Sequence, residues 1–136
     1  MADPVLLDTH TLYWVVTGEG RLGVRARARA ESALTANCLL ISAFSFWEIA
    51  MLTVRQRIEL YKPAGAWRQQ VLESGVEEVP VSGEMGVLAA QLQGFHPDLA
   101  DRIIVATAML RSATLLTADE RILTWSGSLL REDSRL

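Results

Sequence analysis

Four acidic side chains, Asp8, Glu48, Asp101 and Asp119, each fall where a predicted strand passes into a helix or within the helix that follows. Ligands in open α/β sheets bind beyond the carboxyl ends of the strands, so we expect folding to bring these acids together there. Carboxylates within about 6 Å of one another repel by roughly 3 kcal/mol a pair at an effective dielectric constant near 20, and proton uptake or a bound cation relieves that cost. Because hard divalent ions such as Mg²⁺ and Mn²⁺ prefer oxygen ligands, the pattern indicates metal-dependent chemistry on a phosphate ester.

These acids differ in how strongly the sequence supports a site. An aspartate at a helix start is often only a cap worth about 1 kcal/mol, and that alternative stays open for Asp98, Asp101 and Asp119. Glu48 lies in segment 44–52, which holds no other charged residue. Charged side chains are seldom placed in such a segment without a partner, so Glu48 is the strongest single indication of a site.

Composition limits the class of protein. The chain has 136 residues, half of them apolar, which is the size of one compact domain covering 1–136. It holds no long apolar run and no secretion signal, and its single cysteine, Cys38, is most simply a core residue, so we expect a cytoplasmic protein without a membrane partner. A net charge of −3 argues against nucleic-acid binding by overall attraction, so any such contact must be local.

The hydrophobic pattern predicts alternating strands and helices. Strands are expected at 5–7, 38–41, 77–81 and 114–117, with a possible edge strand at 128–130, and helices at 9–16, 24–33, 43–54, 64–73, 83–92, 99–111 and 119–125. Segment 24–33 alternates Arg and Ala like a strand, but both are strong helix formers. The order predicts an α/β fold with three layers, in which helices flank a mainly parallel central sheet of four or five strands.

Four segments together resemble a known family. Segments 6–10, 42–50, 98–102 and 116–121, which read LLDTH, SAFSFWEIA, DLADR and LTADER, resemble the motifs of a PIN domain. More closely, they resemble the VapC-type ribonuclease toxins of bacterial toxin–antitoxin pairs. The resemblance covers almost the whole chain, with the motifs in the family's order.

This resemblance implies a PIN-like fold and a metal-dependent endoribonuclease that hydrolyses RNA phosphodiester bonds with Mg²⁺ or Mn²⁺. Asp8, Asp101 and Asp119 correspond to metal ligands, and Glu48 to a residue that binds a second ion or orients the attacking water. Supporting roles are implied for a further set: Thr9, Ser45, Arg102 and Thr117, the last beside Asp119. The expected partners are RNA, a cognate antitoxin and a second copy of the chain.

Other classes match the residues less well. Phosphatases of the haloacid dehalogenase type need a second aspartate two residues after the first, where this chain has His10. Receiver modules use a lysine late in the chain, whereas the only lysine is Lys62. A non-catalytic PIN-like or receiver-like binding module remains the alternative.

Several side chains keep more than one interpretation. Arg102 either holds a phosphate or pairs with Asp98, and we expect His96 to shape a turn rather than to act in catalysis. Four arginines are expected to concentrate positive charge on one helix, and they either contact RNA or form a solvated face: Arg21, Arg25, Arg27 and Arg29. We expect core packing for most of the four tryptophans and an interface role for one or two.

Overall fold

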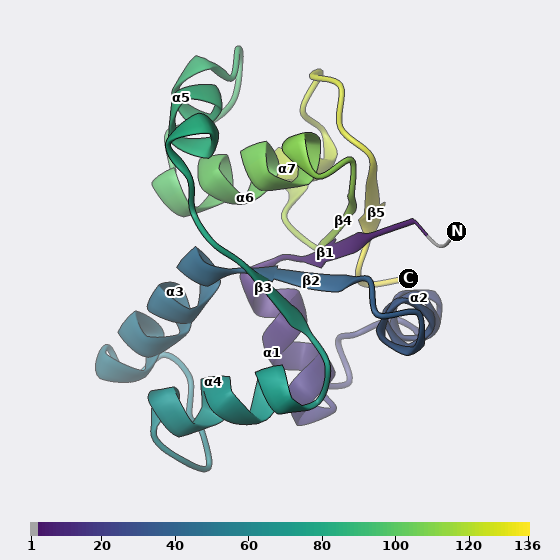
Figure 1. The fold of residues 1–136 in the computed structure, drawn as a ribbon, viewed down its shortest axis with the longest axis vertical. Coiled ribbons are helices and arrows are strands. Elements are labelled where there is room, and N and C mark those ends of the chain that lie inside the picture. Colours follow the sequence, from purple (N-terminus) through teal and green to yellow (C-terminus); the bar gives the residue numbers. More distant parts are fainter. Residues whose placement is uncertain (1–2) are drawn as a thin grey trace.

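A five-stranded parallel sheet forms the centre of the computed structural model, which describes residues 3–136 (Figure 1). The strands are β1 (Val5–Leu7), β2 (Leu39–Ser42), β3 (Glu77–Val79), β4 (Thr114–Thr117) and β5 (Arg131–Asp133). Their order across the sheet is β3-β2-β1-β4-β5, and each neighbouring pair is parallel. The predicted fold class is therefore confirmed, with β1 at the centre.

Helices cover both faces of this sheet (Figure 1). Within residues 3–136 they are α1 (Thr9–Thr17), α2 (Val24–Thr35), α3 (Ala43–Val54), α4 (Ala64–Glu73), α5 (Gly83–Gln91), α6 (Leu99–Leu110) and α7 (Glu120–Leu123). Helices α1 to α4 lie on one side and α5 to α7 on the other, which gives three layers. None of these helices is long and apolar enough to cross a membrane.

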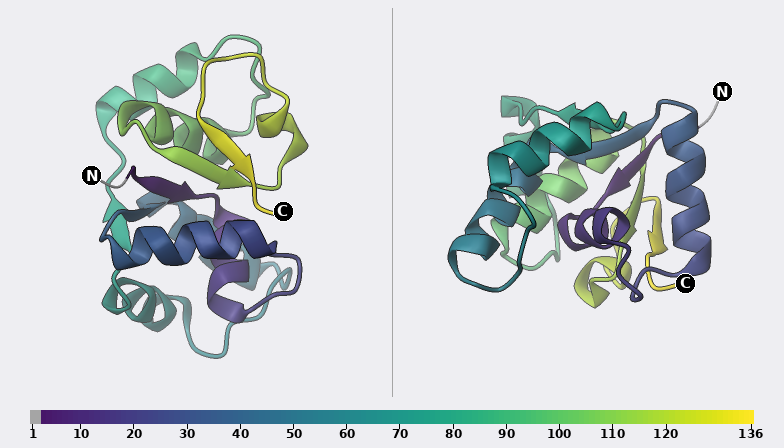
Figure 2. Two further views of the ribbon diagram at one scale, coloured as in Figure 1. Left: turned by 90° about the vertical axis from the view of Figure 1, so that its right-hand side faces the viewer. Right: turned by 90° about the horizontal axis from the view of Figure 1, so that it is seen from below.

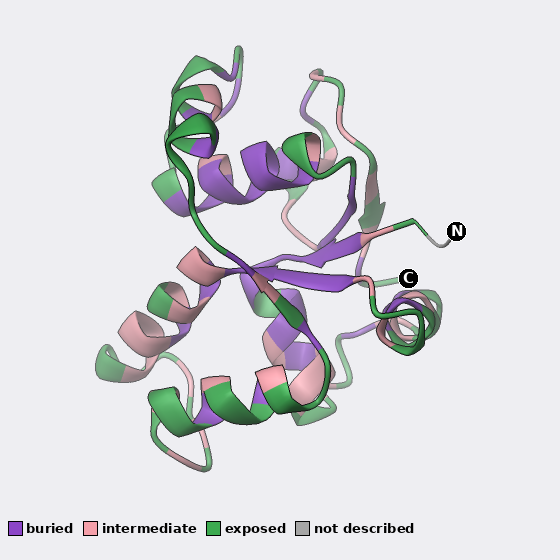
Figure 3. Cartoon of the chain, in the orientation of Figure 1, coloured by how far each residue is buried: buried purple, intermediate pink, exposed green. Residues whose placement is uncertain are grey.

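Alternate residues of each central strand enter different cores because side chains along a strand point to opposite faces. Leu6, Leu40 and Leu115 pack with α5 and α6, whereas their neighbours, including Leu7 and Ile41, pack with α1, α3 and α4. All residues of β1, β2 and β4 are buried, as strands covered on both faces require (Figure 3). This packing fixes the strand ends from which the acids project.

The predicted edge strand was wrong in position. The structure places it at Arg131–Asp133, three residues after the predicted 128–130. Charge made this segment look like a tail, but Arg131 donates to the Trp125 carbonyl and Glu132 lies 3.6 Å from Arg29. Strand β3 is also shorter than predicted, because Pro80 follows Val79 and lacks the N–H that would extend the ladder.

Helix α2 lies beside the last residues of the chain (Figure 2). Its N-terminal Arg25 N–H donates to the Leu136 carbonyl at 2.8 Å. Arg29 contacts Thr114 and Glu132, and Arg21 precedes the helix and lies 3.7 Å from Glu19. The expected row of four arginines on one helix is therefore corrected to Arg25, Arg27 and Arg29.

Three tryptophans are buried: Trp14, Trp67 and Trp125. Trp47 is 54% exposed and lies against Phe44 on α3, with the ring centroids 5.1 Å apart. The core role predicted for most of the tryptophans is confirmed.

Candidate active site

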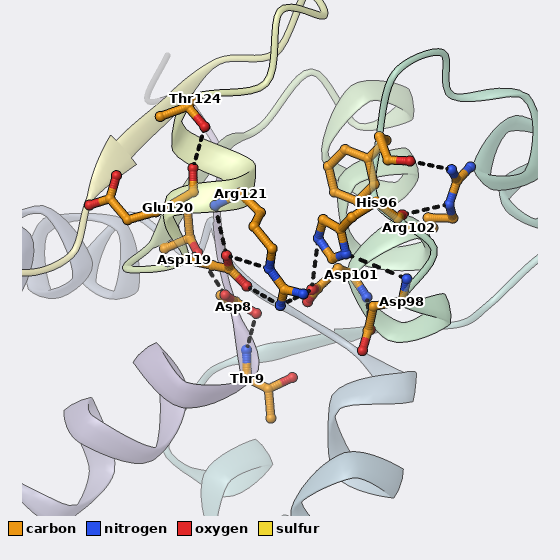
Figure 4. A network of polar contacts seen from close by, with 12 residues as sticks. Asp8, Thr9, His96, Asp98, Asp101, Arg102, Asp119, Glu120, Arg121 and Thr124 are labelled. Atoms are coloured by element: carbon orange, nitrogen blue, oxygen red, sulfur yellow. Dashed lines mark hydrogen bonds and ion pairs between the residues drawn. The ribbon is translucent and has the colours of Figure 1, made fainter.

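Five carboxylates meet in one cleft at the carboxyl ends of β1 and β4. The cleft has a volume of about 310 Å³ and is lined by Asp8, His10, Trp14, Glu48, Asp98, Asp101, Ala118, Asp119 and Arg121. The structure thus brings together all four acids singled out in the sequence, with Asp98 as a fifth. Figure 4 shows that three of the aspartates come from different segments: Asp8 from the junction of β1 and α1, Asp101 from α6, and Asp119 from the turn after β4.

Asp8 is held rigidly at the centre of the site. It caps α1, where Oδ1 accepts a hydrogen bond from the Thr9 N–H at 2.8 Å, and Oδ2 accepts one from the Thr117 hydroxyl at 2.7 Å. Burial raises the pKa of Asp8 above its ordinary value, although these hydrogen bonds act in the opposite direction. A buried carboxylate fixed in this way presents its remaining lone pairs to the cleft.

Thr117 connects two of the acids. Its hydroxyl donates to Asp8 and accepts the Asp119 backbone N–H at 3.1 Å. The family resemblance implied that Thr117 supports Asp119. The structure shows that the Thr117 hydroxyl accepts a hydrogen bond from the Asp119 backbone and donates one to the Asp8 carboxylate.

Glu48 is oriented by two hydroxyl residues. The Thr9 hydroxyl donates to Glu48 Oε1 and lies 2.9 Å from Ser45 Oγ. Because a hydroxyl has one proton, Ser45 is the donor in the contact with Thr9. Burial, together with the charges of Asp8 and Asp98, raises the pKa of Glu48 to about 7. Thr9 and Ser45 therefore have the contacts expected of supporting residues.

Asp101 is an acid whose charged form is opposed by burial and by every other acid in the cleft. It lies in the first turn of α6, where its N–H donates to the Asp98 cap at 3.0 Å. Burial raises the pKa of Asp101 to about 8, and the charges of Asp8, Asp98, Asp119 and Glu48 add to the effect. This carboxyl is partly protonated at neutral pH unless a cation replaces the proton.

The donor set fits a hard divalent cation. Carboxylate oxygens predominate, they are partly buried, and their mutual repulsion falls when positive charge enters. Within residues 3–136, ligand atoms of His96, Asp101 and Asp119 lie within 4.8 Å of one another. Asp8 lines the same cleft. The third ligand beside Asp101 and Asp119 is therefore either His96 or Asp8.

His96 lies beside the acids, which the sequence did not indicate. Its Nε2 is 3.2 Å from Asp101 Oδ2, off the line that an N–H hydrogen bond requires, and its Nδ1 accepts the Asp98 N–H at 3.4 Å. Burial, followed by the charge of Arg121, lowers the pKa of His96 below its ordinary value. His96 is therefore a neutral neighbour of Asp101 near neutral pH.

Arg121 is the second residue that sequence reasoning missed. Its Nη2 lies 2.9 Å from Asp119 Oδ2 and 3.5 Å from Asp101 Oδ2, so the guanidinium bridges two of the acids (Figure 4). Burial acts to raise the pKa of Asp119, but the hydrogen bonds and charge of Arg121 outweigh it and hold that pKa below its ordinary value. The available signal was the spacing Asp-X-Arg that begins two residues after the end of β4.

Arg102 was expected to hold a phosphate or to pair with Asp98, but its guanidinium contacts backbone carbonyls. Its guanidinium donates to the carbonyls of Ala89 at 2.8 Å, Phe95 at 2.6 Å and His96 at 2.9 Å. The predicted pairing with Asp98 is therefore wrong, and the guanidinium that was expected at a phosphate is held by backbone carbonyls. The side chain instead ties α6 to the segment that carries His96, because that segment leaves several carbonyls without partners of their own.

Arg102→Ala is expected to lower the free energy of unfolding by about 3 kcal/mol, because it leaves carbonyls without their charged donor. Urea titration monitored by tryptophan fluorescence measures this change. Arg57→Ala, on an exposed turn residue, is the control and is expected to change stability by less than about 0.5 kcal/mol. Equal stability of the two variants would contradict the structural role of Arg102.

The metal-free protein is expected to lose thermal stability as pH rises from about 7 through about 8. The pKa values of Asp101 (about 8) and Glu48 (about 7) lie above their ordinary values of 3.8 and 4.5, so the folded chain binds more protons than the unfolded chain in that range. Stability then falls with rising pH. The pKa of His96 is lowered, so His96 makes stability rise with pH, but only below about its ordinary pKa of 6.5.

Melting curves in EDTA and in saturating Mg²⁺ between about pH 7 and pH 9 measure this dependence. Mg²⁺ is expected to flatten it, because the cation takes the place of the protons. A melting temperature in EDTA that rises over this range would contradict the pKa assignments.

Comparison with known proteins places the chain in a family. A PIN domain family model matches residues 5–124. Ribonuclease VapC22 of Mycobacterium tuberculosis (strain ATCC 25618 / H37Rv) is 36% identical over 119 residues, which cover 87% of this chain and 88% of that protein. The family model spans all the segments that contribute the acids.

Solved structures share the fold. VapBC2 from Rickettsia felis, bound to a DNA fragment from its promoter, has a chain that aligns with a TM-score of 0.71 at 16% identity, covering 95% of this chain and 97% of that one. DNA-bound VapBC from Salmonella typhimurium aligns with a TM-score of 0.69 at 17% identity, covering 97% and 98%. At such identities the likeness concerns the fold alone. The family model and the 36% identical relative show that the chain belongs to the PIN-domain family and, within it, to the VapC-type proteins.

Proposed function

We propose that the protein is a metal-dependent endoribonuclease that hydrolyses RNA phosphodiester bonds and serves as the toxin of a VapBC-type toxin–antitoxin pair. One observation carries the proposal: Asp8, Glu48, Asp101 and Asp119 line a single cleft, in a chain 36% identical to a ribonuclease. Such a concentration of carboxylates, two of them buried, is costly to folding unless positive charge enters the cleft.

Asp8, Asp101 and Asp119 would hold the divalent cation, for which Mg²⁺ and Mn²⁺ are the candidates. When bound, the cation supplies charge that offsets the non-bridging phosphate oxygens and acidifies water. The chain contributes a fixed donor geometry. Thr117 and the Thr9 N–H hold both oxygens of Asp8, so this ligand needs little reorganisation when the cation binds.

Glu48 would accept a proton from the water that attacks phosphorus. A general base works best with a pKa near the working pH, and burial raises the pKa of Glu48 to about 7. The Thr9 hydroxyl donates to the carboxylate, and Ser45 contacts Thr9, so these residues would orient Glu48. No covalent intermediate with the chain is required, because water is the nucleophile.

The proposed partners are RNA, a cognate antitoxin and a second copy of the chain, in the cytoplasm where RNA is available. Support for the antitoxin comes from the solved neighbours, which are named as VapBC assemblies, and from the strongly acidic cleft, which would accept a basic side chain. Trp47, exposed on α3, is a suitable anchor for a protein interface.

The test uses purified antitoxin-free protein and its Asp8→Asn variant, incubated with total cellular RNA in Mg²⁺, Mn²⁺ or EDTA. New RNA ends are then mapped by sequencing. Discrete ends that require both the cation and Asp8 support an endoribonuclease and identify its target. Absence of new ends in every condition would favour a binding module instead.

A further inference from the structure

Arg121 is the one guanidinium that lines the acidic cleft, as far as residues 3–136 show, and it faces five carboxylates there. Its Nε lies 3.2 Å from Asp119 Oδ1, and its Nη2 contacts both Asp119 Oδ2 at 2.9 Å and Asp101 Oδ2 at 3.5 Å. These are oxygens that a cation held by Asp101 and Asp119 would need. The guanidinium therefore competes with a metal ion for the same ligands.

The Arg121 side chain can leave this position without disturbing the fold. It is 60% exposed, and its guanidinium contacts within the described chain are to the acids, not to the core. Its backbone N–H donates to Asp119 Oδ1 at 2.9 Å at the start of α7, so the backbone has a contact that does not involve the guanidinium. A divalent cation at the acids would repel the guanidinium, which would then extend from the cleft wall into solvent.

We propose that Arg121 exchanges partners as the site is loaded: it bridges Asp101 and Asp119 in the metal-free protein, and, once a cation displaces it, it binds an RNA phosphate at the mouth of the cleft. This inference rests on the proposed function. The planar fork of a guanidinium matches two phosphate oxygens as well as it matches a carboxylate. In a chain with a net charge of −3, one mobile arginine at the cleft supplies the local attraction that the overall charge does not.

The chain contains a matched control for this residue. Arg135 follows Asp133 at the same spacing, and its N–H and Nε both lie 2.9 Å from Asp133 Oδ1, while Nη2 lies 2.7 Å from Oδ2. The local geometry is that of Arg121 and Asp119, but neither Arg135 nor Asp133 lines the acidic cleft. Loss of the ion pair with the aspartate two residues earlier is thus common to both substitutions. Arg135→Ala also removes a contact with Glu120 Oε1, and only Arg121→Ala changes the lining of the acidic cleft.

The first experiment measures cation binding without RNA. Mn²⁺ alone is titrated into EDTA-stripped wild type, Arg121→Ala and Arg135→Ala by calorimetry, with melting curves to verify folding. Arg121→Ala is expected to bind Mn²⁺ about two- to fivefold more tightly, and Arg135→Ala is expected to match the wild type. Unchanged or weaker binding by Arg121→Ala would overturn the inference alone. Failure of the wild type to bind any Mn²⁺ would overturn the proposed function as well.

The second experiment measures RNA cleavage at saturating cation. Arg121→Ala is expected to raise KM about tenfold with little change in kcat, and to reduce the slope of log(kcat/KM) against log[salt] by about 0.7. Arg121→Lys keeps the positive charge but lacks the planar fork of the guanidinium. Its KM is expected to lie between those of the wild type and Arg121→Ala. A KM and a salt slope equal to those of Arg135→Ala would show that Arg121 does not contact RNA phosphate.

Discussion

Asp101→Asn is expected to abolish metal-dependent RNA cleavage while leaving the protein folded and more stable than the wild type at pH 8 in EDTA. Asp101 has a pKa raised to about 8 by burial and by the neighbouring acids, so its ionised form opposes folding in the absence of a cation. Asparagine has similar volume and carries no charge. The same substitution removes a proposed cation ligand, and a loss of at least about 10³-fold in kcat is expected, as for other preorganised electrostatic groups.

The measurements are cleavage of a defined RNA in Mg²⁺ and melting curves in EDTA. Glu31→Gln removes a negative charge from the exposed middle of α2 and is the control, with activity and stability expected near wild type. Full activity of Asp101→Asn would remove this residue from the catalytic site. Unfolding of Asp101→Asn, with Glu31→Gln intact, would indicate that the carboxyl serves the fold.

Glu48→Gln is expected to lower kcat by about 10² to 10⁴-fold, the usual contribution of a general base, with a smaller change in KM. The glutamine side-chain oxygen can still accept a hydrogen bond from the Thr9 hydroxyl, so the local structure is expected to persist. Single-turnover cleavage at saturating cation separates the chemical step from RNA binding. Cleavage at the wild-type rate would show that Glu48 takes no part in the reaction.

A comparison of Glu48→Gln with Thr9→Val tests how Glu48 is positioned. Thr9→Val removes the hydroxyl that contacts both Glu48 and Ser45 but keeps the carboxylate. A smaller loss than that of Glu48→Gln, about tenfold, is expected for a supporting residue. The two effects are not expected to add in the double variant, because Thr9 acts through Glu48.

The acids of the site were predictable because each follows a local rule. Asp8 comes directly after a buried apolar strand and Asp119 two residues after a buried one, and Glu48 interrupts an apolar helix where a lone charge is costly. Helix α2 was predictable against its alternating pattern because Ala and Arg favour helix. In each case the information lies within a few residues.

The misplaced features depend on distant partners. Arg131 and Glu132 of β5 look like part of a charged tail until Trp125 and Arg29 provide contacts for them. Arg102 could not be assigned because its partners are backbone carbonyls, one of them 13 residues away. Every residue has a carbonyl, so the sequence does not indicate which ones bind the guanidinium. Arg121 and His96 meet at Asp101 only after α6 and α7 pack on the same face of the sheet.

The central claim is that Asp8, Asp101 and Asp119 form a cation site beside Glu48. It is tested most directly by titrating Mn²⁺ into EDTA-stripped wild type and Asp101→Asn by calorimetry at pH 7 in buffers of different ionisation enthalpy. We predict that the wild type binds Mn²⁺ and releases protons, because Asp101 and Glu48 have pKa values of about 8 and about 7, and that Asp101→Asn binds far more weakly. Equal Mn²⁺ affinity in the two proteins, or no binding by the wild type, would contradict a metal centre built on these acids.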